Sequence, residues 1–250
     1  MQELGAEDHG GPREPVVWVT GGGSGMGRAA ALSAAIRGWR VALSGRRPER
    51  VEAVAREVEV AGGEVLALPG DVRSGDDVMA TLAAVEERWG RLDALVLAAG
   101  RNAPRRTWQD QDLRELGDII DTNLVSVARV VQLALPQLRS RGGTVVVVSS
   151  YAGWRFSPGA GVAYSVSKTA LSSLCQLLNA QEAGSGVRAC HLCPGDVDTE
   201  FLAHRPEVPR AAARSVMLTA DDVARAVQFV LESPAHVRID ELVLSPVSQH

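Results

Sequence analysis

The stretch that decides the fold is VVWVTGGGSGMGRAAALSAAIR, residues 16–37. It opens with a short β-branched run, Val16–Thr20, and passes through glycines. From Arg28 to Arg37 it has the alanine-rich composition of a helix. Strand, glycine-rich turn and helix in this order form the first unit of a parallel α/β sheet. A glycine-rich turn can be merely a turn, and its place at the first strand–helix junction is what favours a binding role.

The turn predicts a site for the pyrophosphate of a dinucleotide. Glycine has no side chain to keep a ligand from the backbone, and a helix N-terminus offers unpaired N–H groups and the positive end of its dipole. We therefore expect seven residues of this turn to contact the cofactor. These residues are Thr20, Gly21, Gly23, Ser24, Gly25, Met26 and Gly27.

The end of the next predicted strand, residues 41–44, indicates which dinucleotide to expect. An acid at this point would accept a hydrogen bond from a ribose 2′-hydroxyl. Here Arg46 and Arg47 stand instead, and guanidinium groups suit a 2′-phosphate by charge and by geometry. We predict NADP(H), with NAD as the weaker alternative. The competing interpretation is that both arginines are solvated residues before the helix that begins at Pro48.

Strands and helices alternate along the rest of the chain, without an internal repeat. This favours one Rossmann-type, doubly wound parallel sheet with helices on both faces over two domains. We expect a flexible arm over 1–14, one domain over 15–250, and a flap over the site near 200–217, where Pro206 and Pro209 interrupt any periodicity. Strands are predicted at 64–68, 94–97, 145–149, 187–192 and 241–244, and helices at 48–62, 76–89, 112–138 and 220–231, with another around Tyr164.

Further cofactor contacts are predicted just past the strands. Asp71, beside Val72, could accept a hydrogen bond from an adenine amino group or could equally be a turn residue. Small residues after 94–97 would let the cofactor lie close to the strand end, and Thr199 could hold a ring carboxamide. The expected contacts are Asp71, Val72, Ala98, Ala99, Gly100, Pro194, Gly195, Val197 and Thr199.

A reaction centre is predicted in SYAGWRFSPGAGVAYSVSK, residues 150–168. Tyr164 and Lys168 are four residues apart and share one face of a helix. A free tyrosine titrates near about pKa 10, and a neighbouring cation favours its phenolate. Ser150 follows a buried strand, and its hydroxyl can donate to a developing oxyanion. Tyr-x-x-x-Lys is also common on helix surfaces, so the pair alone is weak support.

Asparagine is unfavourable inside a helix, so Asn123, within the predicted helix 112–138, is expected to be exposed or to mark a local kink. The three cysteines, Cys175, Cys190 and Cys193, are too few for a disulfide framework, which fits a reducing compartment. Cys190-His191-Leu192-Cys193 could be a redox pair or half a zinc site. No second Cys/His pair follows, so we expect buried strand residues and no metal.

Composition excludes several function classes. The 250 residues are 46% apolar and 22% charged with a net charge of −4, which indicates a soluble globular protein without a basic surface for nucleic acid. The N-terminus is polar and acidic, unlike a signal peptide, and no run of about 18 apolar residues occurs. We expect a cytoplasmic protein with neither nucleic acid nor membrane as its partner.

These motifs together resemble the classical short-chain dehydrogenase/reductase family, from about Pro15 to the end of the chain. The family's Thr-Gly-x-x-x-Gly-x-Gly turn is matched by residues 20–27, and its Pro-Gly and threonine by Pro194, Gly195 and Thr199. Its active-site Asn, Ser, Tyr and Lys fall on Asn123, Ser150, Tyr164 and Lys168.

The resemblance implies an oxidoreductase that interconverts a carbonyl and a secondary alcohol with NADP(H). Tyr164 would exchange the proton and Ser150 would steady the oxygen. Lys168 would lower the pKa of the tyrosine and hold the nicotinamide ribose, and Asn123 would position a water that links the lysine to solvent.

Two departures from the family pattern stand out. The family's Asn-Asn-Ala-Gly is Leu97-Ala98-Ala99-Gly100 here, which puts in doubt side-chain bonds that brace the sheet. The loop between Ser150 and Tyr164 is slightly longer than usual, so Ser149 is an alternative to Ser150.

The C-terminal residues 233–247 resemble those of NADP-dependent 3-hydroxy acid (serine-type) dehydrogenases. That branch implies a short 3-hydroxy acid as substrate and a homotetramer, with a dimer as the alternative. A ketoreductase for a larger secondary-metabolite or acyl substrate is the second candidate, and an NADPH-sensing regulator without turnover is the third. Substrate contacts are expected from Asn102, Trp154, Arg155, Phe156 and the flap, and a wide apolar pocket of Trp154 and Phe156 would favour the ketoreductase.

Overall fold

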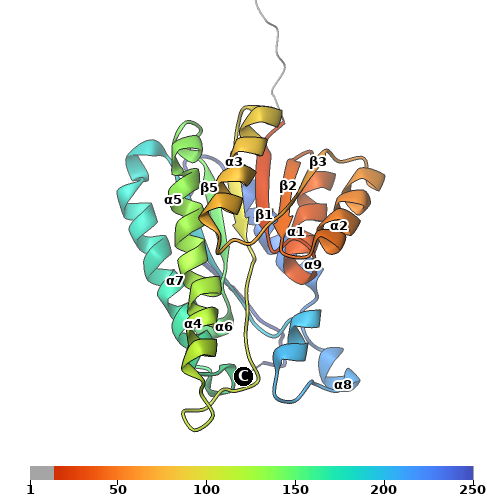
Figure 1. The fold of residues 1–250 in the computed structure, drawn as a ribbon, viewed down its shortest axis with the longest axis vertical. Helices are drawn as coiled ribbons and strands as arrows, with labels where there is room; N and C mark the ends of the chain where they lie inside the picture. Colours follow the sequence, from red (N-terminus) through yellow and green to blue (C-terminus); the bar gives the residue numbers. More distant parts are fainter. Residues whose placement is uncertain (1–13, 250) are drawn as a thin grey trace, which may run out of the picture.

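A seven-stranded sheet, parallel throughout, forms the centre of the molecule (Figure 1). The structure is a computed structural model that describes residues 14–249; residues 1–13, nearly all of the predicted arm, and His250 lie outside this range. The strand order is β3-β2-β1-β4-β5-β6-β7, which confirms the predicted fold class. The strands are β1 Val16–Thr20, β2 Arg40–Gly45, β3 Val65–Pro69, β4 Ala94–Leu97, β5 Thr144–Val148, β6 Arg188–Pro194 and β7 Glu241–Leu244.

Helices cover both faces of the sheet, because the side chains of each strand alternate between two apolar cores. Val17 and Val19 of β1 face α1 Gly25–Ile36, α2 Pro48–Val60 and α9 Ala220–Leu231. Val16 and Trp18 face the other way, toward α3 Gly75–Trp89, α5 Ser126–Arg139 and α7 Val162–Gln181. Strands buried on both sides explain why these segments read as continuous apolar runs.

The predicted helix 112–138 is a continuous helical segment with a π-helical turn in its middle. It consists of α4 Leu113–Ile120, the π turn Asp121–Val125 and then α5. The expected exposure of Asn123 is wrong, since this side chain is fully buried in the π turn, whereas the expected local distortion is confirmed. By length and composition alone, Leu113–Arg139 is the one helix among residues 14–249 that could cross a membrane. Val130, Val131 and Leu138 of this helix pack into the core, which accounts for its apolar composition.

The carboxyl ends of the strands meet at one edge, where the strand order reverses between β1 and β4. Ligands of open parallel sheets bind at such a reversal. Helices α4, α6 Tyr151–Trp154 and α8 Ala211–Arg214 extend beyond this edge in Figure 1.

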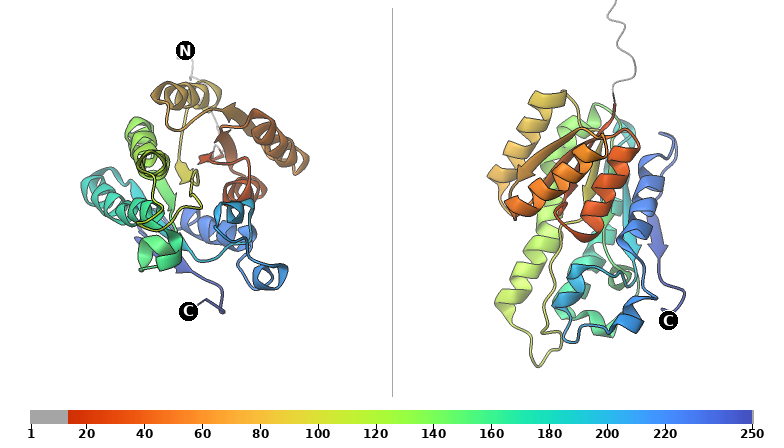
Figure 2. Two further views of the ribbon diagram at one scale, coloured as in Figure 1. Left: turned by 60° about the horizontal axis from the view of Figure 1, so that its bottom comes forward. Right: turned by 90° about the vertical axis from the view of Figure 1, so that its right-hand side faces the viewer.

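The flap, residues 200–217, lies beneath the same edge (Figure 2). Although its sequence shows no helical periodicity, the flap contains two short helices, Glu200–His204 and α8. A β-bridge between Val197 and Leu218 joins its two ends, and Ser248 Oγ donates to Val216 O at 3.4 Å, so the C-terminal residues lie against it.

Candidate active site

The glycine-rich turn packs backbone against backbone, as its composition requires. Helix α1 starts at Gly25 inside the turn, three residues before the predicted start at Arg28. A Cβ on Gly27 would lie 2.4 Å from the carbonyl oxygen of Gly21, and one on Gly21, whose φ is +66°, would lie 2.7 Å from Ala99. The side chain of Ser24, the residue before the helix, caps no N–H group. The first N–H groups of α1 are therefore left for an anion.

A cleft of about 710 Å³ runs from this turn toward the end of β2. Arg46 and Arg47 line it, are exposed, and bond to no acid within residues 14–249. Arg50 of α2 also lines the cleft and forms an ion pair with Glu200 of the flap. Neither the position of Arg50 in the cleft nor this ion pair was predicted from the sequence. A free helix N-terminus at one end and unpaired guanidinium groups at the other fit a phosphorylated dinucleotide.

Asp71 and Val72 do not line this cleft. Asp71 Oδ1 accepts a hydrogen bond from Arg73 N at 3.0 Å and Oδ2 accepts one from Arg73 Nη2 at 2.7 Å, and Arg73 lowers the pKa of Asp71. This favours the interpretation of Asp71 as a turn residue over an adenine contact.

Residues 97–100, which lack the two asparagines of the family pattern, are held to the sheet by other contacts. Leu97 is buried in the core, and Ala99 N donates to Thr20 Oγ1 at 3.3 Å, which connects the ends of β4 and β1. Ala98 and Gly100 line the cleft.

Tyr164 and Lys168 lie on one face of α7, as predicted. Lys168 is buried; its Nζ lies 5.8 Å from the centre of the Tyr164 ring and donates to Val148 O at 2.8 Å. Burial lowers the pKa of Lys168 to about 8. It is the chain's only lysine, the other 25 basic residues being arginines. A compact ammonium whose pKa can shift suits this buried place, where a guanidinium would stay charged.

Burial is also the main influence on Tyr164, and it raises the pKa of the phenol. A hydrogen bond with the Ser150 side chain and the charges of Arg106 and Arg205 act in the opposite direction. Lys168, expected to be the activating cation, is turned toward Val148 O instead. The two arginines are therefore the cations that favour the phenolate in this structure.

Ser150, not Ser149, bonds to Tyr164, although both serines line the cavity in front of it. Ser150 Oγ also accepts from Ala152 N at 3.3 Å. Ser149 is buried, and its Oγ donates to Lys168 O at 3.2 Å. A Cβ on Gly153 would lie 2.5 Å from Ser149 Oγ and 2.7 Å from Lys168 O of α7, so the absence of a side chain at Gly153 lets α6 lie close to α7.

Asn123 connects the end of β4 to α7. Its Oδ1 accepts from Arg101 N at 2.7 Å, and its Nδ2 donates to Arg101 O at 2.9 Å and to Ser167 Oγ at 3.0 Å. Ser167 Oγ in turn donates to Tyr164 O at 2.8 Å. Both amide hydrogens are thus used, and one lone pair of Oδ1 is left for a water.

The residues predicted to contact the nicotinamide end of the cofactor lie between the cleft and a second cavity. Thr199 lines both, whereas Pro194, Gly195 and Val197 line only the second. Gln249 Oε1 accepts from Asp196 N at 2.8 Å, so the chain's own C-terminal tail closes one side of this cavity.

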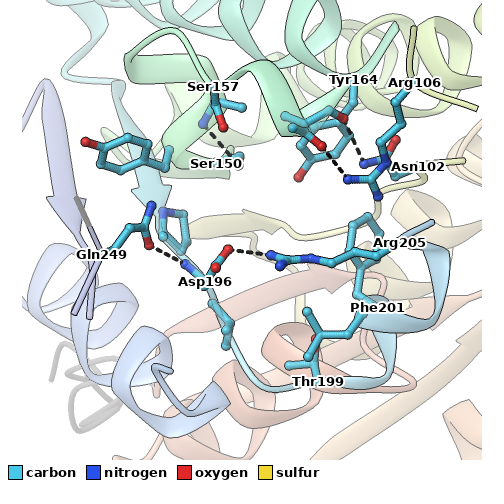
Figure 3. Close-up of a pocket in the computed structure, with 18 of the residues that line it drawn as sticks. Asn102, Arg106, Ser150, Ser157, Tyr164, Asp196, Thr199, Phe201, Arg205 and Gln249 are labelled. Atoms are coloured by element: carbon cyan, nitrogen blue, oxygen red, sulfur yellow. Dashed lines mark hydrogen bonds and ion pairs between the residues drawn. The ribbon is translucent and has the colours of Figure 1, made fainter. Parts of the chain in front are cut away.

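The second cavity, of about 580 Å³, opens in front of Tyr164. In Figure 3, Ser150, Tyr164, Arg106 and Asn102 face Thr199, Phe201 and Arg205 across it. Of the expected substrate contacts, Asn102 and the flap line it, whereas Trp154, Arg155 and Phe156 do not.

Phe156 is 91% exposed and Arg155 stacks on Trp154 at 4.1 Å, outside the cavity. The sequence did not single out Arg106 or Arg205. The only available signal was the pair Arg105 and Arg106 in the loop after β4, at the edge where parallel sheets bind ligands.

Strand alternation divides Cys190-His191-Leu192-Cys193 between the two faces of β6. Cys190 lies in the core of α1 and α9, whereas Cys193 Sγ lies 3.3 Å from His191 Nδ1 on the other face. Glu241 Oε2 is 3.2 Å from the same nitrogen, so these three side chains could hold a metal ion. Burial raises the pKa of Cys193 to about 12, which keeps the thiol protonated in this structure.

Comparison with known proteins identifies the family. The family model described as short chain dehydrogenase matches residues 15–209. The chain belongs to the short-chain dehydrogenase/reductase family and is an oxidoreductase that acts on CH–OH groups.

A sulfoacetaldehyde reductase of Chromohalobacter salexigens is 35% identical over 241 residues, 93% of this chain and 94% of that protein. An alcohol dehydrogenase from the archaeon Thermococcus sibiricus, complexed with 5-hydroxy-NADP, superposes with a TM-score of 0.85 at 31% identity, over 95% of this chain and 98% of that one. Actinorhodin polyketide ketoreductase with NADPH gives a TM-score of 0.85 at 28% identity, over 92% and 95% of the two chains.

Proposed function

We propose that this protein interconverts a carbonyl and a secondary alcohol with NADP(H), using Tyr164 as proton donor and acceptor. One observation carries the proposal: Tyr164 lines both cavities, the cleft that suits a dinucleotide and the cavity beside it. A group placed between two ligands can exchange a proton with one while the other supplies or takes the hydride.

Each remaining residue of the predicted tetrad has a distinct role in the proposal. Ser150 donates a hydrogen bond to the reacting oxygen, and that oxygen receives the Tyr164 proton in the reducing direction. Lys168 lines the cleft and is placed to hold the nicotinamide ribose. Asn123 fixes the backbone around Tyr164 through Ser167 and leaves one acceptor for a proton-relay water.

The same proposal assigns NADP(H) in preference to NAD(H). Its support is the pair Arg46 and Arg47 in the cleft, without an acidic partner within residues 14–249, and the NADP and NADPH of the two solved relatives. Double replacement by alanine removes charge-assisted hydrogen bonds, so we expect NADPH affinity to fall about 10-fold to 100-fold while NADH affinity changes little. Arg56→Ala, on an exposed α2 position outside the cleft, is the control. Tighter binding of NADH by the unaltered protein would contradict the assignment.

A short 3-hydroxy acid or its oxo acid is the proposed substrate, as the serine-type branch implies. The side chains of Asn102, Arg106 and Arg205 in the lining of the second cavity support it, and one relative is named a sulfoacetaldehyde reductase. The alternative, a ketoreductase for larger substrates, called for an apolar pocket of Trp154 and Phe156, and neither residue lines the cavity.

We further infer that residues 15–250 act as one domain with the flap as its cover, and that the enzyme is a cytoplasmic homotetramer. The continuous sheet supports the first point, and the family resemblance and composition support the others. Light scattering of the purified protein would test the tetramer.

The proposed reaction is tested by following nicotinamide absorbance with both cofactors and a panel of 3-hydroxy acids, their oxo acids and bulky ketones. We expect turnover of the small acids with NADP(H). Turnover of bulky ketones alone would favour the ketoreductase, and a protein that binds NADPH but turns over no member of the panel would contradict the proposal.

A further inference from the structure

Arg106 is held in place by backbone carbonyl groups from three segments of the chain. Its Nε donates to Ala103 O at 3.1 Å, one terminal nitrogen donates to Gly159 O at 2.7 Å, and the other donates to His204 O at 2.9 Å. A guanidinium has five N–H groups, so this arrangement leaves one on each terminal nitrogen. A two-oxygen anion binds an arginine through two of its N–H groups, the number that remains here.

The fold makes room for this side chain. Gly161, at the start of α7, has a φ of +93°, and a Cβ there would lie 2.9 Å from Arg106 Cγ. Val162 N also donates to Arg106 O at 3.3 Å. The loop after β4 is therefore anchored to the helix that carries Tyr164, and Arg106 is a fixed part of the cavity wall.

The charge of Arg106 lacks a bonded counter-ion within residues 14–249. Its neighbours in the same loop, Arg101 and Arg105, form ion pairs with Asp118 and Glu115. Arg106 is half-buried, and burial together with the charge of Arg205 lowers its pKa. A partly buried cation with only neutral partners is costly until an anion joins it.

The anion has to arrive from the cavity in front of Tyr164. Arg106 and Arg205 both line it; in Figure 3, Arg106 lies beside Tyr164 on one wall and Arg205 lies on the facing wall. Two carboxylates also line the cavity: Asp196 is bound to Arg205, and Glu207 is exposed and makes no bond to Arg106. The charges of both guanidinium groups act on the phenol, and Arg106, unlike Arg205, has no bonded carboxylate within residues 14–249.

Building on the proposed function, we infer that Arg106, assisted by Arg205, binds one anionic oxyacid group of the substrate, a carboxylate or a sulfonate. The enzyme then selects small charged alcohols and carbonyl compounds, with the anion on Arg106 and the reacting carbon at Tyr164. Arg106 is a specificity-determining residue that the family motifs do not contain.

The test compares charged alcohols with neutral analogues of nearly the same shape. One pair is 3-hydroxybutanoate and its methyl ester; the other is 2-hydroxypropane-1-sulfonate and 1-(methylsulfonyl)propan-2-ol. We expect the unaltered enzyme to prefer each anion at least about tenfold in kcat/KM, since one hydrogen-bonded charge pair is worth that much. The pair with the larger preference tells carboxylate from sulfonate. Equal kcat/KM for anion and neutral analogue would overturn the inference while leaving the proposed function intact.

Arg106→Gln should lower kcat/KM for the preferred anion about 30-fold more than for the neutral analogue, because the bidentate charged contact is lost only with the anion, whereas any effect on the Tyr164 phenol falls on both substrates alike. Arg105→Gln, whose side chain pairs with Glu115 outside the cavity, should change neither. Arg106→Lys keeps the charge but loses the two-pronged guanidinium geometry, so its kcat/KM for the anion should lie between those of the unaltered enzyme and Arg106→Gln. The lysine variant replaces the glutamine variant if the latter does not fold. An equal loss on charged and neutral substrates would contradict the assignment.

Binding separates this inference from the proposed reaction if no alcohol is turned over. Butanoate and propane-1-sulfonate are titrated into the full-length protein, with tryptophan fluorescence as the readout. Saturable binding that Arg106→Gln weakens supports the anion site even where the proposed function fails, and no binding to the unaltered protein overturns it.

Discussion

Replacing Lys168 with methionine should make the protein more stable at neutral pH while removing its activity. Lys168 is buried, with its Nζ bonded only to Val148 O at 2.8 Å, and burial holds its pKa at about 8 against a usual 10.5. The folded state therefore disfavours the charged form. Methionine has a similar length and no charge to desolvate.

The magnitude follows from the shift in pKa. A fall in pKa from 10.5 to about 8 corresponds to about 3 kcal/mol of unfolding free energy that the charged lysine costs at pH values well below 8. Leaving the carbonyl of Val148 without its donor costs about 1 kcal/mol. We expect Lys168→Met to be more stable by roughly 2 kcal/mol near neutral pH. Because the folded pKa lies below the unfolded one, this advantage should shrink as pH rises through about 8 and reverse before about 10.5, where only the lost hydrogen bond remains.

Urea unfolding of both proteins at about pH 6.5 and about pH 9.5 measures this difference. The single lysine also allows a direct measurement, since a protein labelled only at lysine gives one NMR signal, whose titration reports the pKa of Lys168. A variant less stable than the unaltered protein at the lower pH, or a lysine that titrates near about 10.4, would refute this reasoning.

Three further predictions concern the cofactor turn and the packing around the site. Gly27→Ala places a Cβ 2.4 Å from a backbone carbonyl oxygen, and we expect a loss of about 1–3 kcal/mol in stability and weaker NADPH binding by titration, whereas Gly75→Ala, which meets nothing within 4 Å, should change neither. Asn123→Ala empties a buried three-bond network, so unfolding free energy should fall by about 2–4 kcal/mol and turnover should fall with it; an unchanged urea midpoint would contradict this. The pKa of Glu182 is lowered to about 2 by its arginine partner, so the stability that this pair gives above about pH 4.5 should be lost as pH falls toward 2, and Glu182→Gln should remove that pH dependence in acid unfolding curves.

The sheet could be predicted from the sequence because its strands are buried on both faces. Continuous β-branched runs such as Val145–Val148, each followed by a glycine or small residue, mark both the strand and the edge where ligands bind. The elements that were predicted less well begin or bend where tertiary contacts outweigh local preference. Helix α1 starts among glycines, and the π turn around Asn123 is stabilised by bonds to the chain after β4 that no local pattern reveals.

The cofactor cleft and the tetrad could be located because their residues lie in fixed motifs. The substrate cavity could not, since Arg106 and Arg205 come from a loop and a flap far apart in the sequence, which the bond from Arg106 to His204 O joins in the folded chain. Arg155, next to the predicted catalytic segment, was the nearer candidate in sequence, yet α6 turns it out onto Trp154. Which arginine lines the cavity depends on how the four-residue helix α6 packs on α7, where a Cβ on Gly153 would lie 2.7 Å from Lys168 O.

The most direct test of the account is the turnover of Tyr164→Phe, with NADPH binding measured on the same sample. The variant keeps the ring between the two cavities and removes only the hydroxyl that exchanges the proton. We predict a loss of at least about 1,000-fold in kcat, in the range for a missing general acid, with NADPH affinity essentially unchanged. Turnover close to that of the unaltered enzyme would contradict the assignment of Tyr164 and the mechanism built on it.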